Sequence, residues 1–405
     1  APLREIPINR ALKNQCHGVR ESLTGFDEFH YLCRKVLRTM KGLGLLVAAC
    51  VALSAAAAPA VKTYRADDKS AVRIVGRTLA DAGDGSVRFD WSGVYAETEL
   101  DGKALAIKLS DTGKSYFDVF VDGRHTGKVK AAGQDTVVTI ADGLPRGVHK
   151  IAIRKCTEGE TGMTTFHEFI LPKGGSLTAA KPRGRHIEFI GNSLSAGFGT
   201  EGKHPREPFS PESENCNLAY STIIPRYFDA DYTIIAHSGR GAVRNYGDSV
   251  RVSRNAMRHK FMQTFDEDTT VKWSFDGYHP DLVVINLGAN DFSTEPHPYR
   301  REFVDAYCEI IDSIMSKYGA ETPILSVMPY AIDTQIEPMF AEIIQRNSEK
   351  AKIHFVRMPT DYLNWDSDRG AVWHPNYQGQ KKMAMMIIPY VATIMGWEFP
   401  DRKVE

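Results

Sequence analysis

Cysteine is scarce in this sequence: it accounts for six of 405 residues, and only Cys156, Cys216 and Cys308 lie beyond residue 60. Three cysteines do not form the disulfide framework of a small secreted domain, although they leave room for one bridge. No CxxC pair and no Cys/His spacing typical of a zinc site occurs. The sequence therefore predicts buried thiols and no bound metal.

Net charge is also absent, because 50 lysine and arginine residues balance 50 aspartate and glutamate residues. Proteins that bind nucleic acid or anionic membrane surfaces usually carry an excess of basic residues. We therefore expect neither a nucleic acid nor a stable membrane partner. A hydrophobic content of 42% is typical of a globular protein with a substantial core, and the length suggests roughly two to three domains.

Methionine does not occur before Met40. Residues 1–39 are charged, mixed and unpatterned, and we expect them to be an upstream extension and not a functional domain. Residues 40–60 begin with a lysine, continue with an apolar run and end in alanine-rich small residues. This is the three-part form of a secretory signal peptide. The sequence therefore predicts a secreted or periplasmic protein with a bacterial-type signal peptide.

Two alternatives involve the same apolar segment. Residues 43–60 are at the short limit for a membrane-spanning helix, so they could instead anchor the chain. Cys50 follows Val-Ala-Ala, which faintly resembles a lipoprotein cleavage box, but the apolar run continues past it. The layout favours a cleaved signal peptide over either anchor.

Short alternating apolar runs fill residues 61–180. Examples are SVRFDWSG, ALAIKLSD, YFDVFVDG and HKIAIRK, and Asp-Gly turn signals recur between such runs at 101–102, 122–123 and 142–143. This spacing is typical of an all-β sandwich. A glycine- and proline-punctuated linker follows at about 173–184. We expect residues 61–180 to form a jelly-roll-like β-sandwich domain.

The pattern changes in residues 185–398, where apolar strands alternate with longer amphipathic stretches. The strands include DYTIIA, DLVVINLG and IHFVRM, and the helical stretches include FVDAYCEIIDSIMSKYG. Such alternation predicts an α/β domain with a parallel sheet covered by helices on both faces. Functional groups in such sheets gather at the carboxyl ends of the strands.

Polar clusters stand at or after these strand ends in a fixed order. Ser193 follows the strand EFIG, Gly241 lies in HSGRG, and Asn290 follows the strand VVINLG. A serine hydroxyl becomes a nucleophile when a base is nearby, and backbone or amide N–H groups can stabilise an oxyanion. Each residue also has an ordinary structural explanation: a helix N-cap for the serine, a turn glycine, and an Asx-turn asparagine. Ser195 is a second serine in the same segment.

A base for such a serine is expected at His374, in the loop WHPN before the last helical stretch. The following proline restricts the backbone there. Thirteen histidines occur in the chain, however, and three others lie near the polar clusters: His237, His279 and His297. Serine, two oxyanion donors and histidine are the groups that acyl transfer needs.

These residues resemble the blocks of the SGNH (GDSL-like) hydrolase superfamily over about residues 185–397: GNSL at 191–194, Gly241, GxND at 288–291 and His374. The strings YTIIAHSGRGAVRNYG and PDLVVINLGANDFS look more narrowly similar to carbohydrate esterase family two, whose members also carry a β-sandwich before the hydrolase domain. The resemblance implies a flavodoxin-like sheet. It also implies Ser193 as nucleophile, His374 as base, and Ser193, Gly241 and Asn290 as oxyanion donors.

Two positions depart from the superfamily pattern. Asn192 stands where the first block usually has aspartate, and Ala371 stands where the acid of the catalytic triad is normally found. Either a backbone carbonyl orients the imidazole, giving a Ser-His dyad, or another acid does so, with Asp366 and Asp368 the nearest candidates. We expect the dyad.

The resemblance implies a secreted esterase that removes O-acetyl groups from plant polysaccharide or oligosaccharide, without a cofactor. Trp373, Tyr377 and Phe292 are candidates for stacking on sugar rings. One alternative is a lipase or thioesterase on the same fold. Another is a carbohydrate-binding protein with a decayed site, which the changes at Asn192 and Ala371 suggest.

Overall fold

The computed structural model describes residues 61–329, 336–359 and 361–405. The expected extension at 1–39, the signal peptide at 40–60 and Cys50 lie outside the described residues. In the described part of the chain, no helix has the length and apolar character that a membrane span requires. Cys156, Cys216 and Cys308 are buried free thiols, so no bridge joins them.

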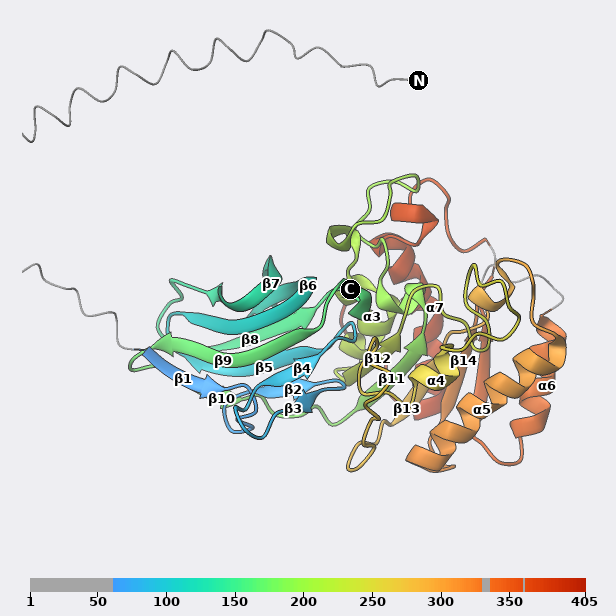
Figure 1. The fold of residues 1–405 in the computed structure, drawn as a ribbon, viewed down its shortest axis with the longest axis horizontal. Coiled ribbons are helices and arrows are strands. Elements are labelled where there is room, and N and C mark those ends of the chain that lie inside the picture. Colours follow the sequence, from blue (N-terminus) through green and yellow to red (C-terminus); the bar gives the residue numbers. More distant parts are fainter. Residues whose placement is uncertain (1–60, 330–335, 360) are drawn as a thin grey trace, which may run out of the picture. The chain divides into compact units, whose positions relative to one another are not determined.

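Residues 61–180, called the β domain below, consist of antiparallel strands (Figure 1). The strands are β1 Val61–Arg65, β2 Arg73–Val75, β3 Leu79–Ala80, β4 Val87–Phe89, β5 Tyr95–Asp101, β6 Leu105–Val121, β7 Arg124–Ala141, β8 Val148–Lys155, β9 Thr164–Pro172 and β10 Ser176–Ala179. They pair in the order β10-β5-β8-β6-β9-β4-β3, and β1, β2 and β7 pair with β9, β5 and β6. The expected all-β architecture is confirmed.

Two details of this domain differ from the sequence pattern. The runs ALAIKLSD and YFDVFVDG, given above as separate, belong to one strand, β6, which has register irregularities between Leu109 and Ser115. The expected linker contains β10, which pairs with β5. The turn at Asp122 and Gly123 is confirmed: both residues have positive φ (52° and 78°), which suits the tight hairpin between β6 and β7.

Residues 185–398, called the α/β domain below, contain a parallel five-stranded sheet in the order β12-β11-β13-β14-β15. Its strands are β11 His186–Gly191, β12 Asp231–Ala236, β13 Leu282–Ile285, β14 Ile324–Met328 and β15 Ile353–Arg357. Its helices are α2 Ser193–Ala196, α3 Tyr220–Tyr227, α4 Met257–Lys260, α5 Arg300–Tyr318, α6 Glu337–Asn347 and α7 Tyr377–Met395. This strand order is that of flavodoxin-like folds, so the predicted architecture is confirmed.

Helices cover both faces of the sheet because alternate strand residues point to opposite sides. Val283 and Ile285 of β13 belong to a buried cluster with residues of α5 and α6. Leu282 and Val284, which alternate with them, belong to a second cluster with residues of α3 and α7. Figure 1 shows these helix pairs beside the parallel sheet.

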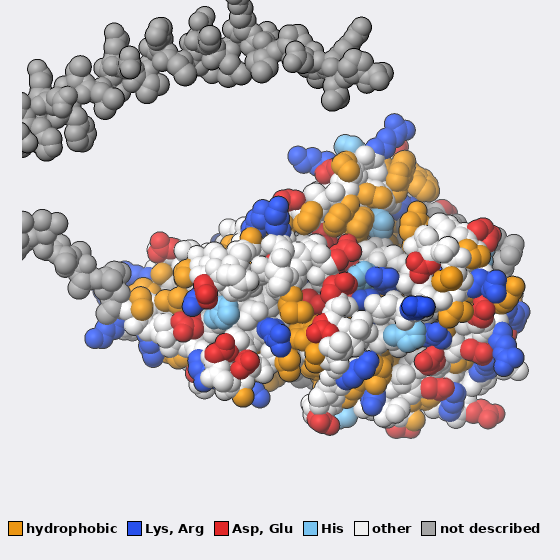
Figure 2. Space-filling model, in the orientation of Figure 1, with side chains coloured by type: hydrophobic (Ala, Val, Ile, Leu, Met, Phe, Trp, Pro, Cys, Tyr) orange, Lys and Arg blue, Asp and Glu red, His pale blue; other side chains and the backbone are white. Residues whose placement is uncertain are grey.

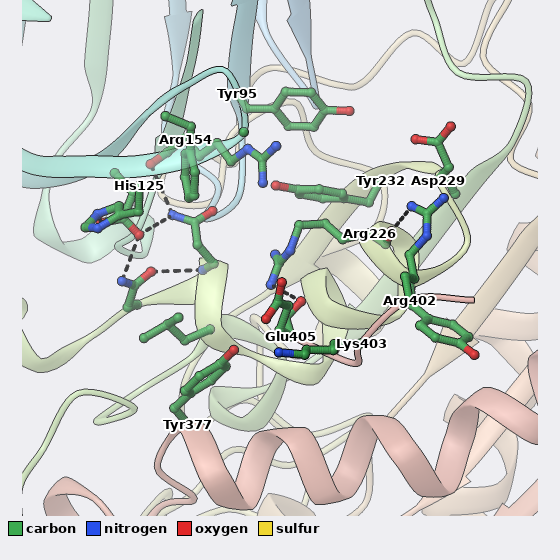
Figure 3. A pocket seen from close by; sticks show the side chains of 18 of the residues that line it. Tyr95, His125, Arg154, Arg226, Asp229, Tyr232, Tyr377, Arg402, Lys403 and Glu405 are labelled. Atoms are coloured by element: carbon green, nitrogen blue, oxygen red, sulfur yellow. Dashed lines mark hydrogen bonds and ion pairs between the residues drawn. The ribbon is translucent and has the colours of Figure 1, made fainter. Parts of the chain in front are cut away.

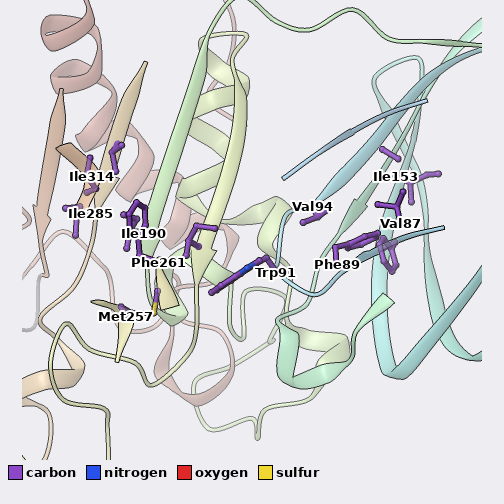
Figure 4. Close-up of a cluster of buried hydrophobic side chains, with 14 of the residues drawn as sticks. Val87, Phe89, Trp91, Val94, Ile153, Ile190, Met257, Phe261, Ile285 and Ile314 are labelled. Carbon is purple, nitrogen blue, oxygen red and sulfur yellow. The ribbon is translucent and has the colours of Figure 1, made fainter. Parts of the chain in front are cut away.

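The first buried cluster continues into the β domain. Trp91 is fully buried, and Figure 4 shows it between Phe89 and Val94 of the β domain and Phe261 of the α/β domain. The Trp91 indole N–H donates to the carbonyl oxygen of Thr264 at 3.0 Å. The surface carries interspersed charges of both signs on the face shown in Figure 2, in keeping with the balanced composition.

Candidate active site

Ser193 begins the short helix α2 directly after β11, at the carboxyl edge of the sheet. The helix is capped by Asn192 and not by the serine: the Asn192 side-chain oxygen accepts from the Leu194 N–H at 3.1 Å, and its amide donates to the carbonyl of Asn286 at 3.2 Å. A Cβ on Gly191 would lie 2.1 Å from Ser195 Oγ, so only glycine allows this turn. The Ser193 hydroxyl therefore remains available for chemistry.

Ser195, the second serine of this segment, has a structural role. It is fully buried, and its hydroxyl lies 2.6 Å from the hydroxyl of Tyr220 on helix α3. A serine enclosed in this way cannot meet a substrate. The structure thus distinguishes the two serines, which sequence spacing alone could only rank.

His374 is brought to Ser193 from 181 positions away in the chain, with His374 Nε2 2.9 Å from Ser193 Oγ. The other ring nitrogen, Nδ1, lies 2.9 Å from the carbonyl oxygen of Val372. A carbonyl oxygen only accepts hydrogen bonds, so Nδ1 carries the proton and Nε2 is left as an acceptor. This tautomer is the one that can take the proton of the serine hydroxyl.

The other histidines near the polar clusters do not reach Ser193. His237 is buried, with its Nδ1 2.8 Å from an Asp266 carboxylate oxygen. His279 is exposed, and His297 is exposed beside Phe292, with ring centroids 5.8 Å apart. Only His374 combines contact with the serine and a fixed orientation.

The imidazole of His374 is neutral around pH 7. Burial is the main cause that lowers its pKa from 6.5 to about 4; the Val372 carbonyl opposes this effect, and the positive charge of Arg369 adds to it. The ring also lies against Phe198, with centroids 4.6 Å apart. A neutral imidazole with a free Nε2 is in the state that a general base requires.

Asp366 and Asp368 do not orient His374, so the structure does not support the alternative of a nearby acid. The buried Asp368 carboxylate accepts from the Asn364 N–H at 2.6 Å and from Lys382 Nζ at 2.5 Å. Asp366 is exposed. The carbonyl of Val372 takes the place of the acid. The structure contains the Ser-His dyad that we expected.

That carbonyl is aimed by an unusual backbone. Val372 (φ 50°, ψ 41°) and Trp373 (φ 63°) have positive φ, a conformation that costs about 1–2 kcal/mol for a residue with a side chain. Backbone hydrogen bonds to the 199–207 segment hold it: the Val372 N–H donates to Glu207 at 3.0 Å, and the Trp373 N–H donates to Pro205 at 3.1 Å. Strain of this kind is typical of functional sites.

The dyad lies in a pocket of about 630 Å³. Its lining includes Ser193, Asn290 and Gly239. One amide hydrogen of Asn290 Nδ2 is bonded to the carbonyl of Arg240 at 2.8 Å, which fixes the side chain and leaves the second hydrogen for a ligand. Asn290 and Ser193 thus border the same pocket, as the predicted role of both as oxyanion donors requires.

Gly241 does not line this pocket, and its N–H is directed at Asn245 Oδ1, 3.4 Å away. Position 241 requires glycine because a Cβ on this residue would lie 2.1 Å from the carbonyl oxygen of Arg244. Gly239, two residues earlier and with a φ of 75°, lines the pocket instead. The lining of the pocket therefore favours Gly239 over the predicted Gly241 as the backbone donor.

Asp291, the last residue of the GxND block, holds the loop after β12. Its buried carboxylate accepts from three successive backbone N–H groups, those of Ala242, Val243 and Arg244, at 2.8–2.9 Å. Burial raises the pKa of Asp291, against the effect of these bonds. The GxND block therefore contributes both a pocket amide and a carboxylate that positions the neighbouring loop.

Of the three aromatic residues proposed for sugar stacking, only Trp373 lines the pocket. It is 46% exposed, and Tyr246, also in the lining, is 61% exposed. Tyr377 faces a separate pocket with Arg226 and Glu405 (Figure 3), so its proposed role is wrong. Phe292 packs against Phe303, with ring centroids 5.0 Å apart, and belongs to the packing around α5.

Within the described residues, one group has the donor atoms for a metal ion: His237, Asp266 and Glu267. Lys260 Nζ already lies 2.7 Å from the Asp266 carboxylate, which places a positive charge where a cation would compete. We assign no metal to this group.

Family models match two consecutive segments: carbohydrate esterase 2 N-terminal over residues 74–180, and the GDSL-like Lipase/Acylhydrolase family over residues 189–382. A cellulase/esterase CelE from Acetivibrio thermocellus is 30% identical over 312 residues, which are 76% of this chain and 38% of that protein. This chain thus spans well under half the length of that relative.

Two further relatives are similar over most of their length. An acetylxylan esterase / glucomannan deacetylase from Cellvibrio japonicus is 26% identical over 327 residues, which are 77% of this chain and 87% of that protein. A solved family two carbohydrate esterase from Clostridium thermocellum, in complex with cellohexaose, is 28% identical with a TM-score of 0.75, over 81% of this chain and 100% of that chain.

The parallel sheet, the serine after its first strand and the matching family model define a GDSL-like hydrolase domain. The preceding β domain matches the N-terminal model of a narrower group, and the relatives with both parts are family two esterases. The chain is therefore similar over both of its parts to family two carbohydrate esterases.

Proposed function

We propose that the protein is a secreted serine esterase that removes O-acetyl groups from plant cell-wall polysaccharide or oligosaccharide. The observation that carries the proposal is the 2.9 Å contact between Ser193 Oγ and His374 Nε2, with the His374 tautomer set by Val372. The relative from Cellvibrio japonicus is an acetylxylan esterase / glucomannan deacetylase, which supports acetylated carbohydrate as the substrate.

The reaction follows from the positions of these groups. Ser193 Oγ attacks the ester carbonyl carbon while His374 Nε2 takes the hydroxyl proton. The tetrahedral oxyanion is stabilised by the Ser193 N–H, the Gly239 N–H and Asn290 Nδ2. Its collapse breaks the bond to the sugar oxygen, which receives the proton from His374 and leaves as a hydroxyl group.

The second half of the reaction removes the acetyl group from the serine. His374, neutral again, takes a proton from water as the water oxygen attacks the acetyl carbonyl. The same donors stabilise the second oxyanion, and collapse releases acetate and restores Ser193. Apart from the substrate and one water molecule, every group used in these two half-reactions belongs to the chain.

The aromatic rim supports a carbohydrate substrate. Trp373 and Tyr246 are exposed beside the dyad, and Trp365, 62% exposed, lies edge-on to Trp373 with centroids 5.9 Å apart. Flat aromatic faces pack against the apolar faces of sugar rings, and both kinds of surface keep polar edges in water. The exposed aromatic surface of Trp373, Tyr246 and Trp365 leaves room for a polymer beside the dyad, whereas an enclosed channel would not.

A substrate panel tests the proposal. Acetate release should be measured from acetylated xylan, acetylated glucomannan, simple acetyl sugars and a series of longer acyl esters, with the wild type and Ser193→Ala. We expect acetate from the carbohydrate substrates, and loss of that activity in the variant. Cleavage of long acyl chains alone would favour the lipase alternative, and binding without hydrolysis would favour the decayed carbohydrate-binding protein.

Secretion is a separate part of the proposal. It rests on the three-part pattern of residues 40–60. N-terminal sequencing of the protein recovered from the medium or periplasm of an expressing bacterium tests it. We expect a mature chain that begins close after residue 60, whereas an intact segment retained in the membrane fraction would favour an anchor.

A further inference from the structure

We infer that the β domain is part of the catalytic machinery, because its residue Glu158 positions the loop that carries the oxyanion donor Gly239. This inference rests on the proposed esterase function. It assigns a role to a domain whose sequence contains no motif of its own. The argument depends on two chains of contacts that run from the β domain to the loop after β12, residues 237–241.

The direct contact is made by Glu158, which precedes the short 3-10 helix Gly159–Thr161 between β8 and β9. The backbone N–H of Ser238 donates to Glu158 Oε1 in a short hydrogen bond. Ser238 is the residue before Gly239, and both line the catalytic pocket. Glu158 is fully buried, so water cannot take its place as the acceptor.

Glu158 is itself held in position from the α/β domain. Its backbone N–H donates to Glu214 Oε2 at 3.2 Å, and Glu214 is also fully buried. The two domains approach closely here: a Cβ on Gly159 would lie 2.7 Å from Asp266 Cβ. The backbone that carries the Glu158 carboxyl group is therefore held against the α/β domain.

An indirect contact supports the start of the same loop. His237, which follows β12, has Nδ1 2.8 Å from Asp266. The backbone N–H of Asp266 donates to Asp90 Oδ1 at 2.7 Å, and that of Glu267 donates to Asp90 Oδ2 at 2.9 Å. Asp90 belongs to the β domain, is fully buried, and precedes the interdomain Trp91.

Together these contacts fix successive residues of the loop from one side, while Asp291 fixes Ala242 to Arg244 from the other. Oxyanion donors act only when they are held where charge develops in the transition state. A displacement of about 1 Å can reduce a rate about 100-fold. Glu158 is thus a positioning residue, since it acts through Ser238 and not on the substrate.

The variants Glu158→Ala and Glu158→Gln test this inference. Alanine removes the acceptor of the Ser238 N–H. Glutamine keeps a carbonyl oxygen there, and because burial raises the pKa of Glu158 well above its usual range, the neutral amide resembles the native carboxyl group. We expect kcat for an aryl acetate to fall about 30-fold in Glu158→Ala, with KM changed by less than about threefold. Glu158→Gln should stay within about threefold of wild type.

Arg73→Ala serves as a matched control for loss of an interdomain contact. Arg73 of the β domain pairs with Asp231 at 2.9 Å, at the opposite end of β12 from the loop. This variant should lower the melting temperature but leave kcat of the folded protein within about threefold of wild type. All measurements belong at a temperature where circular dichroism shows every variant folded.

A second readout separates this inference from the proposed function. The rate at which a fluorophosphonate modifies Ser193 depends on the same oxyanion donors but on no natural substrate. If the wild type hydrolyses no acetyl ester, the proposed function is wrong, and the modification rates of the three variants still test the positioning role. Equal rates for wild type and Glu158→Ala, or equal losses in Glu158→Ala and Arg73→Ala, would overturn the inference.

Discussion

His374 Nδ1 lies 2.9 Å from the carbonyl oxygen of Val372, a residue only two positions earlier in the chain. The catalytic base is therefore oriented by its own loop and not by a carboxylate from elsewhere. A carbonyl fixes the tautomer of the imidazole as an acid would, but it supplies less negative charge to stabilise the imidazolium that forms during the reaction. The following predictions arise from this arrangement and its surroundings.

Replacement of the two aspartates near His374 should have little effect on catalysis. We expect Asp366→Ala and Asp368→Asn to keep kcat within about threefold of wild type, because neither carboxylate contacts the imidazole. Asp368→Asn should lower the free energy of unfolding by about 1 kcal/mol, since it weakens the bond with Lys382. Steady-state kinetics and urea titration measure these effects. A loss of kcat above about 100-fold in either variant would instead indicate that the substituted aspartate is the acid of a catalytic triad.

The pH profile should show one acidic limb. Burial lowers the pKa of His374 to about 4, and the protonated imidazole cannot accept the Ser193 proton. The value of kcat/KM should therefore be constant from neutral pH down to about 5, and fall with a slope of one through about pH 4. Initial rates in buffers of constant ionic strength test this. A midpoint near the ordinary histidine value of 6.5 would contradict the account.

Val372 should tolerate glycine better than an ordinary exposed valine does. Its φ of 50° is strained for a β-branched residue, and glycine relieves that strain at the cost of a more flexible unfolded chain. We expect Val372→Gly to unfold within about 1 kcal/mol of wild type or to be slightly more stable, with the dyad still active.

The control for this comparison is Val250→Gly, in another exposed loop position. Val250 is not among the residues with positive φ, so glycine there should only destabilise, by about 0.5–1 kcal/mol. Thermal melts of both variants decide the matter. If Val372→Gly is the less stable of the two, backbone strain at the site has been overestimated.

Loss of the Asp291 carboxylate should affect both stability and catalysis. An asparagine presents only one acceptor oxygen, and its amide hydrogens face the N–H groups of Ala242, Val243 and Arg244. We expect Asp291→Asn to lower the free energy of unfolding by about 3 kcal/mol, with kcat reduced in the protein that remains folded. The exposed Asp276→Asn is the control, and equal stability of the two variants would refute the assigned role.

Much of the fold could be predicted because its signals are local. Alternating runs and Asp-Gly turns mark the β domain, and buried apolar strands between amphipathic helices mark the α/β domain. These local signals failed where strand pairing decided the outcome: β6 continues past Asp111 because β7 pairs along both of its halves and β8 pairs with the second half. Residues 176–179 form a strand because β5 offers a free edge.

The candidate site could be predicted only in part. Ser193, Asn290 and His374 stand in ordered blocks, and the structure brings all three to one pocket. Gly239 and Gly241 differ by two positions in a loop, and no local pattern says which of them lines the pocket. The failures at Tyr377 and Phe292 have the same origin, since side-chain direction depends on packing. The contact between Glu158 and Ser238 joins residues 80 positions apart, and no sequence motif predicts it.

The most direct test of the account is to trap the acyl-enzyme. An acetyl ester should be mixed with the enzyme, the reaction quenched in acid within the first turnover, and the peptides analysed by mass spectrometry. The account predicts an acetyl group on Ser193 in the wild type, its accumulation when His374→Ala is supplied with an activated aryl acetate, and no acetylated peptide from Ser193→Ala. Acetylation of another residue, or undiminished hydrolysis by Ser193→Ala, would contradict it.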